Sequence, residues 1–278
     1  MMLTIWCTYR GYRTSGAAPH DINALMDELV FYHWLAIAWM ALAVVTFVAL
    51  FFITAPYGRF TRKGWGPRIE SRWGWIIMES PSIIAMVVLF AIGPQRTNPV
   101  AIVLVLLWAV HYVHRTYIFP FRLHSSRQSM TVSVILMAVV FNLGNGYLNG
   151  RYLFDLGPAL QTSWFGDPRF IIGILLFIGG YALNQHADRV LIGLRKPGET
   201  GYKIPRGGAY RFISCPNYLG EMIEWAGWAL MAWNLGAVAF LVWTVANLAP
   251  RAFRTHRWYG QEFADYPKER KALIPFIV

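Results

Sequence analysis

The stretch that decides the fold is residues 184–230, NQHADRVLIGLRKPGETGYKIPRGGAYRFISCPNYLGEMIEWAGWAL. It leaves one apolar run, passes through a basic segment rich in Gly and Pro, and enters a second apolar run that begins with Glu221 and Glu224. Ionisable side chains cost about 2.5–3.5 kcal/mol each at the centre of a membrane helix, so those that occur there are functional candidates. We interpret residues 187–216 as a loop that covers an anionic cofactor, with the neighbouring helices as walls of a reaction chamber.

The composition is that of a membrane protein. Of the 278 residues, 56% are hydrophobic and 14% are charged, whereas a soluble domain carries about 25% charge. Apolar runs near 20 residues long predict an all-α integral membrane protein with seven transmembrane helices and an N-terminal segment over 1–29. One domain, 30–278, then holds the predicted spans 30–54, 73–93, 99–119, 129–148, 168–186, 217–233 and 236–254. Only Asn234 and Leu235 separate the last two, which predicts a tight helical hairpin.

Basic residues are distributed unevenly between the two sides of this arrangement. The segments 55–72, 120–128 and 187–216 and the C-terminal end share one side and carry most of the 25 Lys and Arg residues. Those on the other side are Arg10, Arg13, Arg96, Arg151 and Arg169. Because basic residues favour the cytoplasmic side, we expect the N-terminus outside and the C-terminus in the cytoplasm. The net charge of +11 then reflects topology, and we expect no nucleic-acid partner.

Several other classes of site are not expected. Cys7 and Cys215 lie far apart and make no disulfide framework. No cluster of Cys and His has the spacing of metal ligands, so we expect no metal. The N-terminus lacks the pattern of a cleaved signal peptide. The chain also has no GxGxxG between a strand and a helix, so a dinucleotide would not be held by a Rossmann unit.

Two polar residues of neighbouring predicted helices reach membrane depth. Glu79 and Tyr112 both lie about 10 Å inside the cytoplasmic face at roughly 1.5 Å per residue, and Arg115 lies nearer that face. A Tyr hydroxyl beside a carboxylic acid kept neutral by burial gives two donors for a carbonyl oxygen that becomes an oxyanion. The alternative is a structural hydrogen bond between the two helices.

A second group of residues suits a nucleotide cofactor. Asn184, Asp188, Asn217 and Glu221 offer acceptors and amides for ribose hydroxyls and a carboxamide. Basic residues of the loop, Arg195 and Lys203 among them, offer cations for phosphates. The alternative interpretation of these cations is the positive-inside rule.

The chain resembles a known family. The stretch 184–230, the segment HYVHRTY at 111–117 and the C-terminal YPKERKALIPFIV look like the steroid 5-alpha-reductases, with the match running from about residue 73 to the end. The resemblance implies a seven-helix membrane enzyme that reduces the 4,5 double bond of 3-oxo-4-ene steroids with NADPH.

Site residues follow from the resemblance, position by position. Glu79 and Tyr112 look like the catalytic pair that polarises the 3-oxo group of the substrate, with Trp75 and Met78 beside them as substrate contacts. The positions that resemble cofactor contacts are Arg115, Asn142, Asn145, Asn184, Asp188, Arg195, Tyr202, Lys203, Asn217, Tyr218, Glu221, Arg251, His256 and Tyr259.

Three positions depart from the family pattern. Met78 replaces the usual Gln before the catalytic Glu, which removes one polar contact near the substrate. The family's run of histidines before an aromatic pair is reduced here to Thr255 and His256. This departure weakens the case that a histidine has a functional role at this position. Lys203 replaces the usual Arg and loses bidentate contact with phosphate.

Two other functions remain open at this point. One is a reductase of another lipid enone or enoyl group, such as a polyprenol or an enoyl-CoA chain. The other is a membrane methyltransferase that uses S-adenosylmethionine, whose C-terminal helices look broadly similar; a non-enzymatic sterol-binding protein would leave the polar cluster unexplained. We expect a monomer in contact with membrane lipids, in a bacterial inner membrane or the endoplasmic reticulum, with its active site opening to the cytoplasm.

Overall fold

The computed structural model describes residues 19–53, 60, 64–123, 129–196, 199 and 201–278, with side chains from residue 23 onward. The long helices are α2 (Pro19–Phe52), α3 (Ser71–Ile92), α4 (Pro99–Val113), α6 (Val132–Arg151), α7 (Pro168–Gly193), α8 (Pro216–Ala232) and α9 (Leu235–Glu262). Short elements join them: β1 (Arg68–Glu70), η2 (Pro94–Thr97), η3 (His114–Ile118), α5 (Phe119–Arg122), β2 (Ser129–Thr131), η4 (Tyr152–Leu156), η5 (Thr162–Gly166) and η6 (Gly208–Arg211). Most of the predicted N-terminal segment, 1–18, lies outside the described residues, as do the basic residues Arg59, Arg62 and Lys63.

The helices confirm an all-α membrane protein. Six of those described are long and apolar enough to cross a membrane: Asn23–Phe52, Ser71–Ile92, Pro99–Arg122, Val132–Leu156, Pro168–Gly193 and Leu235–Glu262. The remaining predicted span, 217–233, is α8. With 17 residues it is about 25 Å long, slightly less than the hydrocarbon thickness of about 30 Å.

Several helix boundaries differ from the prediction. α2 begins at Pro19 instead of residue 30, α7 continues to Gly193 instead of 186, and α9 continues to Glu262 instead of 254. Hydrophobicity marks the part of a helix that suits lipid, whereas a helix ends where its backbone hydrogen bonds end. The predicted loop 187–216 is therefore shortened to 194–215, and Asp188 belongs to a helix.

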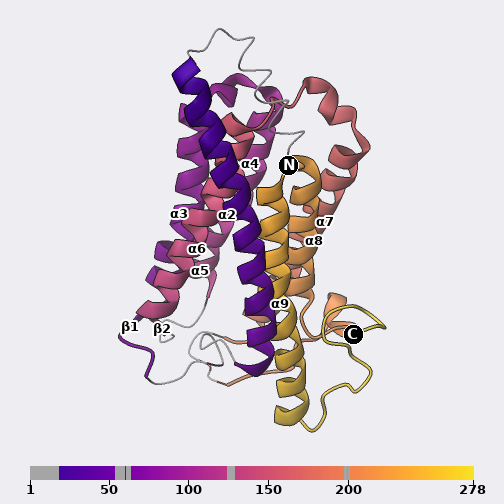
Figure 1. The fold of residues 1–278 in the computed structure, drawn as a ribbon. Helices are drawn as coiled ribbons and strands as arrows, with labels where there is room; N and C mark the ends of the chain where they lie inside the picture. The colour runs from indigo at the N-terminus through magenta and orange to yellow at the C-terminus, as the bar shows by residue number, and fades with distance from the viewer. Residues whose placement is uncertain (1–18, 54–59, 61–63, 124–128, 197–198, 200) are drawn as a thin grey trace.

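The helix predicted over 129–148 begins with a strand. β2 pairs with β1 in an antiparallel ladder in which Ile69 is opposite Met130. Both strands, the turn η6 and the C-terminal segment gather at one end of the bundle, the lower end in Figure 1. A short bridge between Ile213 and Lys271 joins the C-terminal segment to the loop that precedes α8.

Glycines allow α7 and α8 to pack closely. A Cβ added at Gly180 would lie 2.5 Å from the carbonyl oxygen of Gly220, and one added at Gly227 would lie 2.4 Å from the carbonyl oxygen of Gly173. Two pairs of glycines, each seven residues apart, therefore bring the two backbones together. Membrane helices associate through small residues of this kind, because lipid supplies no hydrophobic driving force between helices.

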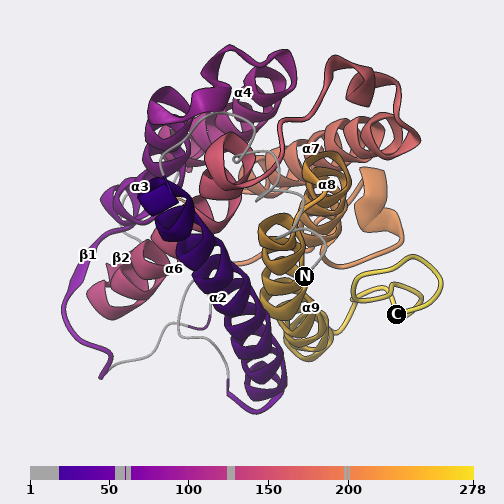
Figure 2. The ribbon, with the colours of Figure 1, turned by 45° about the horizontal axis from the view of Figure 1, so that its top comes forward.

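The other helices pack in pairs around this unit. α3 packs on α6, α8 on α9, and α2 on α9. Figures 1 and 2 both place α2 between the α3–α6 side of the bundle and the α7–α9 side. The predicted tight hairpin between α8 and α9 is present, but its connection is Trp233 and Asn234 instead of Asn234 and Leu235. Asn234 caps α9 by accepting a hydrogen bond from the amide of Ala237 at 2.9 Å.

Candidate active site

Glu79 on α3 is held by a side chain of α6. The Nδ2 atom of Asn142 donates to the carbonyl oxygen of Met78 at 2.6 Å and to Oε2 of Glu79 at 3.3 Å. The two helices approach closely here, because Gly146 faces the methyl group of Ala85. Asn142, predicted to face a cofactor, therefore lies against the predicted catalytic carboxyl group and fixes its orientation.

Tyr112 on α4 is buried, with 3% of its surface exposed. Its ring stacks on Trp108 with centroids 5.0 Å apart and lies 6.0 Å from the ring of Trp225. It is close enough to Glu79 for the two side chains to interact electrostatically. The structure therefore brings the predicted pair together.

No direct hydrogen bond joins Glu79 to Tyr112 within the described residues. Within the described residues, the side chain that donates to the Glu79 carboxyl group is that of Asn142. A direct hydrogen bond between Glu79 and Tyr112 is therefore not seen, and Tyr112 also interacts with Ser82 of α3.

Arg115 lies where α4 passes into the π-helical turn η3. The amide of Phe119 donates to the carbonyl oxygen of His114, five residues back, which is the hydrogen-bond pattern of a π-helix. The next residue, Pro120, has no amide hydrogen to donate. The guanidinium group of Arg115 lies 4.5 Å from the ring centroid of Trp75. It also lies 3.8 Å from Asp188 Oδ2 and 4.0 Å from Glu221 Oε2.

Asp188 and Glu221 come from the two helices packed through glycines. Nδ2 of Asn217 donates to Oδ1 of Asp188 at 3.1 Å, and Nδ2 of Asn184 donates to the carbonyl oxygen of Asn217 at 3.0 Å. These four residues and Arg115 form a single cluster, which we call the polar cluster. The sequence predicted all five members, and the long α7 explains how Asp188 reaches α8.

The loop residues predicted to bind phosphate lie nearer the surface. Arg195 places its guanidinium group 5.6 Å from the ring centroid of Tyr202, which packs against Trp258 at 4.9 Å. Nζ of Lys203 lies 2.7 Å from Oε2 of Glu199. That hydrogen bond lowers the pKa of Glu199, so a phosphate would have to draw Lys203 from an existing partner.

His256, Tyr259 and Tyr218 belong to the same end of the bundle. Ser214 Oγ lies 2.6 Å from Nδ1 of His256 and 2.7 Å from the hydroxyl of Tyr266. Tyr259 stacks on Tyr266 with centroids 5.2 Å apart, and burial raises the pKa of Tyr266. His256 therefore anchors α9 to the loop before α8.

Arg251 also reaches a predicted neighbour, since its Nε donates to the hydroxyl of Tyr218 at 2.8 Å. Met78 packs in an apolar cluster with Met130 and Ile135.

Asn145 is buried, and its Oδ1 accepts from Asn149 at 3.0 Å. Its Nδ2 has no partner within the described residues, so an amide donor remains available inside the bundle.

A buried pair was not among the predicted site residues. Nδ1 of His111 on α4 lies 2.8 Å from Oε1 of Glu224 on α8, and Glu224 is 0% exposed. His111 precedes Tyr112 directly and lies 4.6 Å from Trp225. The spacing of Glu224, three residues after Glu221, was a signal that both carboxylates enter the bundle, but only the fold shows the partner.

Comparison with known proteins decides the family. Residues 128–278 match the family model described as 3-oxo-5-alpha-steroid 4-dehydrogenase. The chain is 41% identical over 257 residues to the steroid 5-alpha-reductase DET2 of Gossypium hirsutum, across 91% of this chain and 100% of that protein. The chain belongs to this family. It is an oxidoreductase of the kind that acts on CH–CH bonds.

Animal members of the family show similar identity. The 3-oxo-5-alpha-steroid 4-dehydrogenase 1 of Bos taurus is 42% identical over 244 residues, which cover 86% of this chain and 93% of that protein. The protein of the same name from Homo sapiens is 39% identical over 223 residues, which cover 80% and 85%. The resemblance inferred from residue 73 onward is confirmed, and the methyltransferase alternative falls away.

Proposed function

We propose that the enzyme reduces the 4,5 double bond of 3-oxo-4-ene steroids to 5-alpha-3-oxo steroids, with NADPH as reductant. The observation that carries this proposal is the convergence of Glu79, Tyr112 and Arg115 from α3, α4 and η3. The side chains of Glu79 and Tyr112 suit a carbonyl oxygen of the substrate. Arg115 belongs to the polar cluster, which we assign to the cofactor. A reductase of another lipid enone is the alternative, since the same pair would serve any conjugated carbonyl.

Glu79 and Tyr112 hold the 3-oxo group of the steroid. Hydrogen bonds from the Tyr hydroxyl and the protonated carboxyl group draw electrons toward O3, so C5 becomes electrophilic and the developing enolate is stabilised. Asn142 keeps the carboxyl group oriented, because it donates to Oε2. The apolar surroundings limit the access of water while the charge develops. The reduction is completed when C4 of the enolate takes up a proton that comes ultimately from solvent.

The residues present fit NADPH. The polar cluster offers carboxylates and amides for hydroxyl groups, and the buried Nδ2 of Asn145 lacks a partner that a carboxamide oxygen could supply. Arg115, Asn184, Asp188, Asn217 and Glu221 would hold the nucleoside end, with Arg195 and Lys203 toward phosphate. When bound, NADPH supplies the hydride that is added to C5.

We also propose that α8 crosses the membrane with the six longer helices. Seven spans place the N-terminus outside and the C-terminus in the cytoplasm, in accordance with the distribution of basic residues. The polar cluster then opens to the cytoplasm, where the cofactor is found, and the steroid enters from lipid. We propose a monomer in a bacterial inner membrane or the endoplasmic reticulum.

The test is NADPH oxidation by the detergent-purified protein, with and without testosterone or progesterone, and with products identified by mass spectrometry. A steroid-dependent gain of two hydrogens at the 4,5 bond is expected. NADPH binding without steroid turnover would move the substrate to another lipid. Absence of NADPH binding would overturn the cofactor assignment.

A further inference from the structure

His111 and Glu224 form a buried pair inside the bundle. Nδ1 of His111 lies 2.8 Å from Oε1 of Glu224, and the two side chains are 7% and 0% exposed. Oε2 of Glu224 is buried and has no hydrogen-bond partner in the part of the chain that the structure describes. A buried carboxyl group with one oxygen unsatisfied costs stability. Two apolar side chains of similar size often stabilise a fold at least as well as a buried polar pair, so stability alone does not account for these residues.

The pair connects α4 to α8, two helices that also meet through large aromatic side chains. α4 packs on α3, whereas α8 packs on α7 and α9. The ring of Trp108 on α4 lies 5.4 Å from that of Trp225 and 5.0 Å from that of Trp228, both on α8. Aromatic pairs form over a range of separations and angles. A hydrogen bond weakens steeply when its geometry changes, so His111 and Glu224 define the spacing of the two helices more sharply.

α8 is the fixed side of this contact. A Cβ added at Gly180 of α7 would lie 2.3 Å from the amide nitrogen of Glu224, so the backbones of α7 and α8 already touch at this residue. α8 is therefore held in place by α7 where Glu224 leaves it. His111 then sets where α4 lies relative to that fixed point.

The two helices carry the two sides of the proposed reaction. Tyr112 follows His111 directly, and the two rings meet edge to face with centroids 5.0 Å apart. Glu221 precedes Glu224 by one turn of α8 and belongs to the polar cluster. Because we assign the substrate carbonyl group to Tyr112 and the cofactor to the polar cluster, the spacing of α4 and α8 sets the distance over which hydride moves. A displacement of about 1 Å in an active site costs on the order of 100-fold in rate.

We propose that His111 and Glu224 are positioning residues, whose hydrogen bond holds the Tyr112 side of the active site at the hydride-transfer distance from the cofactor side. The inference rests on the proposed function, because it takes Tyr112 as the substrate contact and the polar cluster as the cofactor site. Neither member of the pair touches the reacting atoms. The pair therefore acts on the rate of hydride transfer and leaves the affinity for NADPH unchanged.

The test is single-turnover reduction of testosterone, or of whichever lipid enone the wild type reduces, followed through the loss of NADPH absorbance. A slower rate with NADPH deuterated at C4 of the nicotinamide identifies the hydride-transfer step. His111→Leu combined with Glu224→Met replaces the pair by apolar side chains. We expect this double variant to unfold at the wild-type temperature or above, to bind NADPH within threefold of wild type, and to transfer hydride at least tenfold more slowly.

His111→Asn is the rescue variant. The amide nitrogen of asparagine takes the place of Nδ1 and keeps the hydrogen bond to Glu224, although the aromatic ring is lost. Its hydride-transfer rate should stay within threefold of wild type. A purely structural role for the pair would give the opposite order, with the stable apolar variant the faster of the two.

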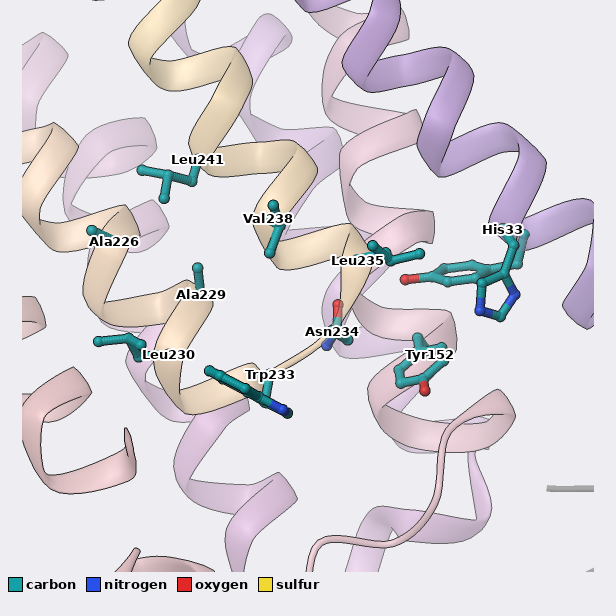
Figure 3. A pocket seen from close by; sticks show the side chains of 11 residues that line it. His33, Tyr152, Ala226, Ala229, Leu230, Trp233, Asn234, Leu235, Val238 and Leu241 are labelled. Carbon is teal, nitrogen blue, oxygen red and sulfur yellow. The ribbon is translucent and has the colours of Figure 1, made fainter. Parts of the chain in front are cut away.

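Tyr32→Phe is the matched control for the loss of a buried hydrogen bond. The hydroxyl of Tyr32, which is 0% exposed, accepts from the amide of Gly236 at 2.9 Å, and the variant retains the ring. Tyr32 lines an apolar pocket at the α8–α9 hairpin together with Trp233 and Asn234 (Figure 3), at the other end of α8 from the polar cluster. Hydride transfer in this variant should stay within twofold of wild type.

Three results would overturn the proposal. One is a rate within threefold of wild type in the apolar double variant, and another is an equal fall in rate and NADPH affinity, which would assign the pair to cofactor binding. The third is a His111→Asn variant as slow as the apolar one. If the apolar variant does not fold, His111→Gln replaces it, because it moves the amide by one methylene, and a rate equal to that of His111→Asn would reject the role of the hydrogen bond. The wild type alone tests the proposed function and the ratios between variants test this inference, so the two fail separately.

Discussion

Replacing Tyr112 with Phe isolates one hydroxyl group of the proposed active site. The ring is retained, and with it the stacking on Trp108 at 5.0 Å and the neighbouring Trp225. Losing one hydrogen-bonding group in this way costs about 0.5–1.5 kcal/mol of stability. The variant therefore folds, and its kinetics report on the hydroxyl alone.

The expected loss of turnover follows from the two donors that we propose for O3 of the steroid. Removing one preorganised oxyanion donor typically lowers kcat by about 10²–10³-fold, equivalent to about 2.7–4 kcal/mol. Glu79 remains as the second donor and keeps its contact with Asn142. NADPH affinity should change less than about threefold, since Tyr112 donates no hydrogen bond to the polar cluster and a threefold change is only about 0.65 kcal/mol.

The assay is steady-state NADPH oxidation with testosterone, combined with NADPH binding measured by quenching of tryptophan fluorescence. Tyr117→Phe is the matched control, because it removes the same atom from an exposed tyrosine whose hydroxyl lies 3.1 Å from Oγ of Ser80. That variant should keep turnover within about twofold of wild type. If Tyr112→Phe also stays within threefold, or if turnover and NADPH affinity fall equally, the oxyanion role is wrong.

Three further changes test other parts of the structure. Glu79→Gln should lower kcat by at least about tenfold with little change in NADPH affinity, because an amide is a weaker donor than a carboxylic acid; equal loss of both in the same assays would indicate a structural role. Gly180→Leu should destabilise the protein by about 1–3 kcal/mol or more in thermal unfolding, since its Cβ would lie 2.3 Å from the amide nitrogen of Glu224, whereas nothing lies within 4 Å at the control position, Gly179. The hydrogen bonds from Arg169 lower the pKa of Asp167 from its ordinary 3.8 to about 2, so this carboxylate stabilises the fold above pH 4 and its contribution is lost as pH falls through 2. Asp167→Asn, which still caps α7, should remove that pH dependence, and an unchanged acid-unfolding curve would contradict this assignment.

Much of the site could be predicted from the sequence, because its members are ionisable residues in apolar surroundings. Glu79, Tyr112, Arg115 and Asp188 stand out in this way, and the resemblance to a family assigned their roles. The structure brings these four together, while their catalytic and cofactor-binding roles remain predictions. The hydrogen-bond partners of these residues could not be predicted from the sequence. Asn142 was assigned to a cofactor, and only the packing of α3 on α6 places it against Glu79.

The sequence by itself determined the class of fold, the approximate positions of the spans and the family, since long apolar runs and unbroken motifs are local properties of the chain. Only the tertiary structure decided that α7 extends past Asp188 and that His111 meets Glu224 across the bundle. These features depend on contacts between residues far apart in the chain. The His111–Glu224 contact shows why, since hydrophobic periodicity contains no information about which polar side chains pair.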